Sequence, residues 1–194
     1  SDTSGLAELN LIALGATSKP ESLIRVPGAN GSIFALVGVG NEELDEDSLR
    51  EVGAAAARSL KGFREIIFDL PTDDDRDAVS VIEGALLGIY SYKNASTGHV
   101  TKSALKAITV LSSHKVSAGQ IERSRTLASG VERVRDLVNT PPNQLFPKSF
   151  ADIVSGETEG LGVKVSVLDE KALKAGNYGG ILAVGQGSSR PPRL

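Results

Sequence analysis

Short runs of aliphatic and β-branched residues alternate along this chain with longer segments in which apolar residues recur every three or four positions. The runs have the length of β-strands, and the longer segments have the period of α-helices. This alternation is typical of an α/β protein, in which helices cover a sheet. Successive apolar residues at Ile66-Ile67-Phe68 predict that both sheet faces are covered. Strands are expected at Leu9–Leu14, Ser32–Val39, Glu65–Leu70, Ala107–Ser112, Val163–Leu168 and Gly180–Val184.

The helical period predicts two helices in the first half of the chain, at Asp47–Leu60 and Asp75–Ile89. Thr72 or Asp73 is expected to cap the second helix, because short polar side chains accept hydrogen bonds from free amides at a helix start. A three-and-four spacing of apolar residues in this helix predicts one buried stripe. The stripe consists of Val79, Ile82, Leu86 and Ile89.

The longest expected helix is Ala118–Asn139. Ser117 and Gln120 match a capping box at its start, and Pro141-Pro142 prevents it from continuing. Two shorter helices are expected near Lys148–Val154 and Glu170–Ala175. The long helix carries a second apolar stripe that we predict to be buried, formed by Leu127, Val131, Val134 and Val138.

The sign of the charge changes near this long helix. Residues 1–114 carry 10 basic and 16 acidic groups, a net charge of −6, whereas residues 115–194 carry 11 and 8, a net charge of +3. We predict an N-terminal α/β domain at 1–114, an interdomain helix at 115–140 and the start of a second domain at 141–194. Two strands and two short helices in the last segment are too few to enclose a core. With no methionine in the sequence, the chain is expected to be a piece of a longer protein.

The sequence holds few residues that suggest chemistry. It has no cysteine, which excludes disulfides, thiolate zinc sites and a cysteine nucleophile, and its two histidines, His99 and His114, are far apart. Gly38-Val39-Gly40 follows an expected strand, but a dinucleotide fingerprint would need glycine where Glu43 stands. The acidic run Asp73–Asp77 lacks the ligand spacing of a calcium loop and is interpreted as a solvated helix start. Ser188-Ser189 lacks the glycine that a nucleophile elbow requires at position 190.

No catalytic, cofactor-binding or metal residue is therefore assigned from the residues themselves. No segment reaches the roughly 20 consecutive apolar residues of a membrane helix. The expected location is the cytoplasm, without a membrane partner.

Four segments resemble the leucyl aminopeptidase family, the cytosol aminopeptidases. Residues 134–143 (VRDLVNTPPN) resemble the end of the family's interdomain helix and the opening of its catalytic domain. Residues 167–173 (VLDEKAL) and 179–194 (GGILAVGQGSSRPPRL) resemble the first strand, helix and strand of that domain. Residues 83–90 (EGALLGIY) resemble a helix of the family's N-terminal domain.

The resemblance implies a macro-domain-like N-terminal domain with a mixed sheet flanked by helices, followed by a catalytic α/β domain. Members of this family form hexamers and remove N-terminal residues from peptides with two divalent ions, zinc or manganese, that activate a shared water. Their metal ligands lie in Gly-Lys-Gly and Asn-Thr-Asp-Ala-Glu-Gly-Arg type motifs, which this sequence lacks. The chain alone is therefore expected to bind no metal, to be inactive, and to serve assembly and substrate access.

A binding module is the alternative. Some bacterial members of the family bind DNA, and a macro-like fold implies binding of an ADP-ribose-type ligand as a second alternative. The net charge of −6 on residues 1–114 disfavours nucleic acid, because non-specific DNA affinity depends on neutralising phosphates. Fold analogy does not define a site.

Overall fold

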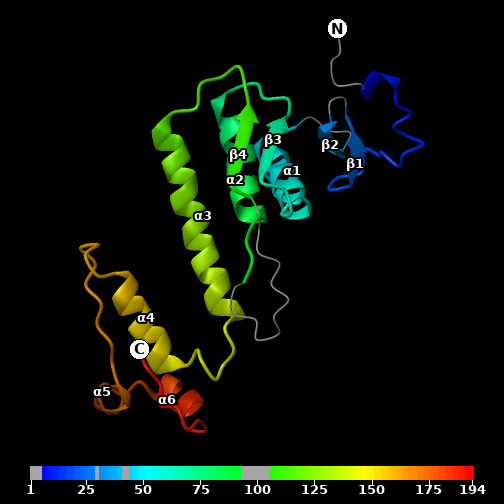
Figure 1. The fold of residues 1–194 in the computed structure, drawn as a ribbon. Coiled ribbons are helices and arrows are strands. Elements are labelled where there is room, and N and C mark those ends of the chain that lie inside the picture. Colours follow the sequence, from blue (N-terminus) through cyan, green and yellow to red (C-terminus); the bar gives the residue numbers. More distant parts are fainter. Residues whose placement is uncertain (1–5, 29–30, 41–43, 93–104) are drawn as a thin grey trace. The chain divides into compact units, whose positions relative to one another are not determined.

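The computed structural model describes residues 6–28, 31–40, 44–92 and 105–194 (Figure 1). The chain divides into two compact units, 1–135 and 136–194, which are described separately. The division falls within helix α3 (Ala118–Asn139), which begins and ends at the predicted residues. In the part of the chain that is described, no helix is both long enough and apolar enough to cross a membrane.

The first unit contains two small sheets. Strands β1 (Leu23–Pro27) and β2 (Ile33–Val37) are antiparallel, with Leu23 opposite Val37. Strands β3 (Glu65–Asp69) and β4 (Ala107–Leu111) are parallel, with Glu65 opposite Ala107. Parallel strands need a crossover connection, and here it contains helix α2 (Asp75–Gly88). Within the described ranges the strands form these two separate sheets rather than the single mixed sheet that we expected.

Helix α1 (Glu46–Ser59) packs closely against α2. Glycines make this approach possible. A Cβ built on Gly53 would lie 2.7 Å from the Val81 carbonyl oxygen, and one built on Gly84 or Gly88 would collide with the backbone of Arg50 or Ala54. The small-residue face of α2 is therefore the buried one.

This packing corrects the predicted burial of α2. Val79, Ile82, Leu86 and Ile89 are only partly buried, whereas the fully buried residues of α2 are Ala78, Ser80, Val81, Gly84, Ala85 and Gly88. Small residues are required where two backbones approach closely, so the larger aliphatic side chains lie along another side of the helix. The N-cap is Asp74 rather than Thr72 or Asp73, and its side chain accepts hydrogen bonds from the Arg76 and Asp77 amides.

The hydrophobic core of the first unit lies between α1, α2 and the strands. Its fully buried members are Leu49, Ala56, Ala57, Leu60, Ile66, Phe68, Val81 and Ala85. Residues from β1, β2 and β4 pack around this cluster. The opposite face of the β3–β4 sheet is open, since Ile67 is 58% and Leu111 49% exposed. The prediction that both faces are covered is therefore wrong for this structure.

One expected strand of the first half is absent, and one strand that was not expected is present. Leu9–Leu14 forms turns, in which the Ala13 amide donates to the Asn10 side chain and the Leu14 amide to the Asn10 carbonyl. The strand that does form nearby, β1, was not predicted. Short polar side chains such as that of Asn10 favour turns by accepting from amides a few residues along.

The second unit holds three helices, α4 (Pro147–Glu157), α5 (Glu170–Ala175) and α6 (Gly179–Gly185). The predicted helices near 148–154 and at 170–175 are thus present. The expected strand Val163–Leu168 has no strand structure, and Gly180–Val184 is helical within α6. A strand can satisfy its backbone only by pairing with a neighbour, whereas a short helix satisfies much of its backbone internally. Leu168 pairs with Leu194 through two backbone hydrogen bonds. The Leu168 amide donates to the Leu194 carbonyl oxygen at 2.6 Å, and the Leu194 amide donates to the Leu168 carbonyl oxygen at 3.1 Å.

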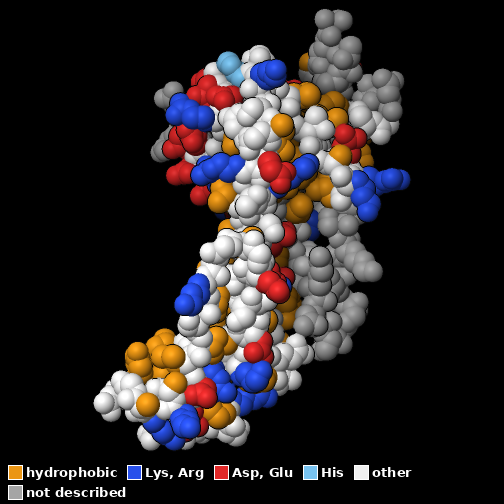
Figure 2. Space-filling view, turned by 90° about the vertical axis from the view of Figure 1, so that its left-hand side faces the viewer, with side chains coloured by type: hydrophobic (Ala, Val, Ile, Leu, Met, Phe, Trp, Pro, Cys, Tyr) orange, Lys and Arg blue, Asp and Glu red, His pale blue; other side chains and the backbone are white. Residues whose placement is uncertain are grey.

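The predicted stripe on α3 is exposed instead of buried. Leu127, Val131, Val134 and Val138 are 47%, 39%, 59% and 79% exposed, and the buried residues of α3 are Ser124 and Ala128. Hydrophobic side chains are visible at the molecular surface in Figure 2.

The capping box is confirmed, because Ser117 Oγ accepts from the Gln120 amide at 3.2 Å and Gln120 Oε1 accepts from the Ser117 amide at 2.9 Å.

Candidate functional site

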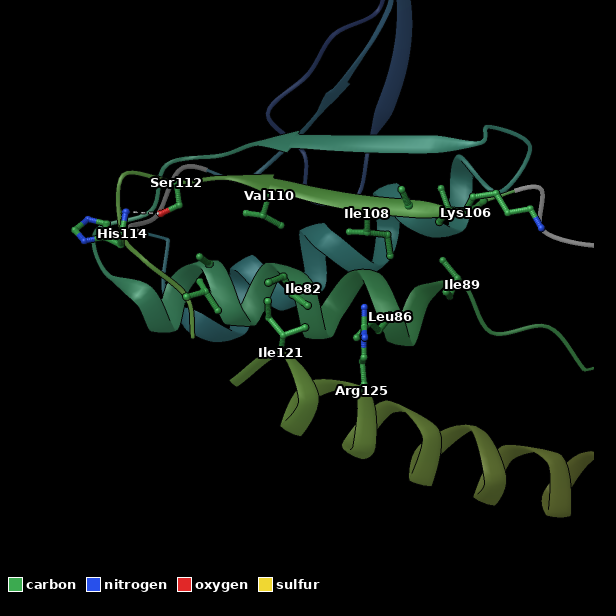
Figure 3. A pocket seen from close by; sticks show the side chains of 14 residues that line it. Ile82, Leu86, Ile89, Lys106, Ile108, Val110, Ser112, His114, Ile121 and Arg125 are labelled. Carbon is green, nitrogen blue, oxygen red and sulfur yellow. Dashed lines mark hydrogen bonds between the residues drawn. The ribbon is translucent and has the colours of Figure 1, made fainter. Parts of the chain in front are cut away.

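A cleft bounded by α2, β4 and the start of α3 is the candidate binding site of the first unit (Figure 3). Its volume is about 550 Å³. Helix α2 contributes Ile82, Leu86 and Ile89, the large aliphatic residues that the close approach of α1 leaves on its other side. The packing of α1 on α2 therefore explains why the cleft is apolar. We refer to it as the α2–β4–α3 cleft.

Strand β4 and helix α3 supply the other apolar walls. Ile108 and Val110 project from β4, and Ile121 projects from α3 (Figure 3). The β4 side chains alternate in exposure, as expected for a strand with one face toward helices. The described residues that line the cleft are Ala78, Ile82, Leu86, Ile89, Leu105, Lys106, Ala107, Ile108, Val110, Ser112, His114, Val116, Ile121 and Arg125.

The ionisable side chains of the lining are all basic. They are Lys106, His114 and Arg125, and none of the lining residues that the structure describes is Asp or Glu. Lys106 lies where β4 begins and His114 beyond its end, whereas the Arg125 side chain points from α3 toward Leu86 (Figure 3). The His114 amide donates to Ser112 Oγ at 3.0 Å, which holds the turn after β4.

Polar contacts hold α3 against α2 beside this cleft. Ser124 Oγ donates to Glu83 Oε1 at 3.3 Å, and the other carboxylate oxygen of Glu83 accepts from Arg50 Nε at 3.3 Å. Gln120 Nε2 donates to Asp75 Oδ2 at 2.8 Å. The Glu83 side chain is only 16% exposed, so its charge is partly desolvated and its two partners matter for stability.

A second set of contacts fixes α3 near its C-terminal end. Arg135 donates from one guanidinium nitrogen to the Leu87 carbonyl oxygen at 2.8 Å, and its guanidinium lies 5.4 Å from the centre of the Tyr90 ring. Lys61 donates to the Tyr90 carbonyl oxygen at 2.5 Å. Burial lowers the pKa of Lys61, and the positive charges of Arg58 and Arg135 lower it further.

The two glycine amides of the turn after β2 are bonded within the chain and do not face a phosphate. The Gly38 amide donates to the Ser22 carbonyl oxygen at 2.8 Å, and the Gly40 amide donates to the Ser18 carbonyl oxygen at 2.7 Å. A Cβ on Gly38 would collide with the Lys19 carbonyl oxygen, so glycine allows the backbone segments to approach. Gly40 has φ of +83°, a conformation that favours glycine.

The acidic run at the start of α2 is a network of caps and ion pairs. Asp74 accepts from the Arg76 guanidinium at 2.8 Å, and Asp77 accepts from the Asp73 amide at 2.7 Å. The hydrogen bond from the Arg76 side chain is the main cause that lowers the pKa of Asp74, and the Asp77 amide adds to it. Arg76 also lies 3.5 Å from Glu46 of α1. These contacts agree with the interpretation of the run as a helix start.

The remaining residues considered from sequence are not brought together. His99 lies outside the described residues, and His114 is exposed at one end of the α2–β4–α3 cleft. Ser188 accepts from the Arg190 amide at 3.0 Å in the second unit. Among the residues that the structure describes, no three His, Asp or Glu side chains are grouped to hold a metal ion.

In the second unit, the Arg190 side chain contacts the turn that follows α3. Its guanidinium lies 4.0 Å from the centre of the Phe146 ring and donates to the carbonyl oxygens of Pro142 and Asn143 at 3.2 Å. Sequence reasoning missed this contact, because the Pro-Pro signal indicates only where α3 ends. The arginine joins two segments that are 47 and 48 residues apart in the sequence.

Solved structures share this fold. A tomato leucine aminopeptidase mutant superposes with a TM-score of 0.84 at 24% identity, covering 97% of this chain and 41% of that chain. The bottromycin maturation enzyme BotP gives a TM-score of 0.78 at 26% identity, covering 100% of this chain and 42% of that chain. The fold is therefore that of part of a leucine aminopeptidase-like α/β protein.

Sequence comparisons identify the family. The model of the cytosol aminopeptidase family's N-terminal domain matches residues 13–98, and the model of its catalytic domain matches residues 132–194. The chain belongs to the cytosol aminopeptidase family, which confirms the resemblance described above.

Curated relatives agree with this assignment. A probable cytosol aminopeptidase of Streptomyces griseus subsp. griseus is 41% identical over 208 residues, covering 95% of this chain and 40% of the relative. A probable cytosol aminopeptidase of Leifsonia xyli subsp. xyli is 39% identical over 193 residues, covering 98% of this chain and 38% of the relative. The chain thus spans about 40% of the length of the curated relatives that it matches.

Proposed function

We propose that these 194 residues are the N-terminal domain and the opening of the catalytic domain of a leucyl aminopeptidase, which removes N-terminal residues from peptides. The observation that carries the proposal is the match of both family models, in the order N-terminal domain then catalytic domain, on one chain. We further propose the boundaries 1–114, 115–140 and 141–194 for the N-terminal domain, the interdomain helix and the catalytic portion.

We place the metal-binding and catalytic residues of the whole protein outside this sequence. The Gly-Lys-Gly and Asn-Thr-Asp-Ala-Glu-Gly-Arg type motifs implied by the family are absent here, and the relatives are about two and a half times as long. When bound, two divalent ions would supply an activated water and polarise the peptide carbonyl. One structural neighbour, BotP, is described as a complex with Mn, which supports manganese as one candidate ion.

The proposed role of this chain is assembly and substrate access. We propose that the whole enzyme is a cytoplasmic hexamer and that the first unit contributes contacts between its subunits. The exposed apolar stripe of α3 supports a surface of this kind, because a monomeric soluble protein rarely leaves a contiguous apolar patch uncovered.

The gene sequence is the first test of the proposal. Reading onward from the codon of Leu194 should reveal further coding sequence that contains both metal-binding motifs. A stop codon directly after Leu194 would overturn the assignment of the catalytic residues to a later segment.

The purified chain provides the second test. With manganese or zinc added, the 194 residues should hydrolyse leucine anilide no faster than a chelated control, whereas the extended protein should show hydrolysis that the chelator abolishes. Metal-dependent turnover by the 194 residues alone would contradict the proposed inactivity.

A further inference from the structure

The α2–β4–α3 cleft has two properties that together select a ligand. Its walls are aliphatic, and the ionisable side chains among its described lining residues are all basic, with no carboxylate among them. Its volume of about 550 Å³ lies within the range of small-molecule sites. A matching ligand would therefore be a small molecule that has an apolar part and one negatively charged group.

Arg125 is the basic residue best placed to meet that negative group. Its side chain points from α3 toward Leu86, between the aliphatic walls, whereas Lys106 and His114 lie toward the two ends of β4 (Figure 3). Within the described ranges Arg125 forms no ion pair, unlike Arg50 and Arg76, which pair with carboxylates. A planar guanidinium binds a carboxylate through two parallel hydrogen bonds.

We propose that the α2–β4–α3 cleft binds a medium-chain aliphatic monocarboxylate. The carboxylate pairs with Arg125, and the hydrocarbon tail lies between Leu86 of α2 and Ile108 of β4. A free amino acid matches less well, because its ammonium group would find no carboxylate in the lining. The binding test measures no peptide hydrolysis, so its result does not depend on the proposed enzyme activity.

Octanoate is the probe for the wild-type chain. Titration should shift the methyl NMR signals of Ile82, Ile108 and Ile121, which line the cleft, and leave those of Ile24 and Ile33 in the β1–β2 sheet unchanged. Each added methylene from hexanoate to octanoate should tighten binding by about two- to fourfold, because burial of a CH₂ group is favourable by about 0.8 kcal/mol. Octanol, which lacks the charge, should bind more weakly than octanoate.

Two arginine substitutions on α3 distinguish a specific contact between Arg125 and the carboxylate from general electrostatic attraction to the positive charges of the helix. Arg125→Gln should weaken octanoate binding at least about fivefold, since a hydrogen bond to a charged group is stronger than a neutral one. Arg123→Gln removes the same charge from an exposed residue of α3 outside the lining and should change the affinity less than twofold.

Three results would overturn the proposal: equal affinity for octanol and octanoate, equal effects of the two arginine substitutions, or methyl shifts spread over both sheets. The ligand series uses the unmodified chain, so the first and third tests remain decisive even if Arg125→Gln disturbs folding.

Discussion

Replacing Gly84 by alanine tests the close packing that defines the first unit. The new Cβ would collide with the backbone of Arg50 in α1, and a backbone cannot rotate away as a side chain can. Overpacking of this kind costs about 1–3 kcal/mol, and a backbone clash belongs near the upper end. Alanine in a helix is favoured over glycine by about 1 kcal/mol, which offsets part of the cost. We expect Gly84→Ala to lower the free energy of unfolding by about 2 kcal/mol.

Gly130 supplies a matched control within α3. A Cβ there meets no atom within 4 Å, so Gly130→Ala should gain the helix preference alone, about 0.5–1 kcal/mol. The two substitutions are chemically identical and are expected to act with opposite signs.

Urea unfolding followed by circular dichroism measures both variants. With a slope of about 1–3 kcal/mol per molar urea, the Gly84→Ala midpoint should fall by about 1 M. A Gly84→Ala midpoint at or above that of the unsubstituted chain would refute the reasoning, because it would mean that α1 and α2 are not in backbone contact.

Three further predictions concern the helices. Ser117→Ala should destabilise α3 by about 1 kcal/mol in a urea titration, since it removes the confirmed capping box, and an unchanged midpoint would contradict this. Leu127→Ser and Val134→Ser should each change the free energy of unfolding by less than about 0.5 kcal/mol, because both side chains are exposed; a larger loss would mean that the stripe is covered in solution. The pKa of Asp74 is lowered by Arg76, so its stabilising effect is present above the ordinary carboxyl pKa of 3.8 and is lost as pH falls through the lower folded value. Asp74→Asn should therefore flatten the acid limb of the stability–pH curve, and an unchanged limb would refute this assignment.

Local signals in the sequence predicted the helices well. Helix α3 begins and ends where the capping box and the Pro-Pro pair indicate, and α5 has the predicted bounds. These features are local, because a cap or a proline acts on amides within one turn of itself. The candidate cleft was not predicted, since its lining is drawn from α2, β4 and α3, and no spacing along one segment reveals it.

Strand assignment was less successful, and the reason is physical. A run such as 180–184 is apolar enough for a strand, but a strand exists only when another segment pairs with it, and this segment is helical instead. The β1 strand was missed because its residues show only a weak strand pattern in the sequence, and its pairing with β2 stabilises it.

The sequence by itself determined the α/β class, the bounds of α3 and α5, the change of charge sign and the family resemblance, because each depends on neighbouring residues or on the order of a motif. Only the tertiary structure decided which helix faces are buried. The stripe Val79–Ile89 was expected in the core, yet the glycines at 53, 84 and 88 bring α1 and α2 so close that only small side chains fit between them. The large residues Ile82, Leu86 and Ile89 consequently line a cleft opposite Arg125. Burial of a helix face depends on the distance to the neighbouring helix, which the spacing of residues along one helix does not reveal.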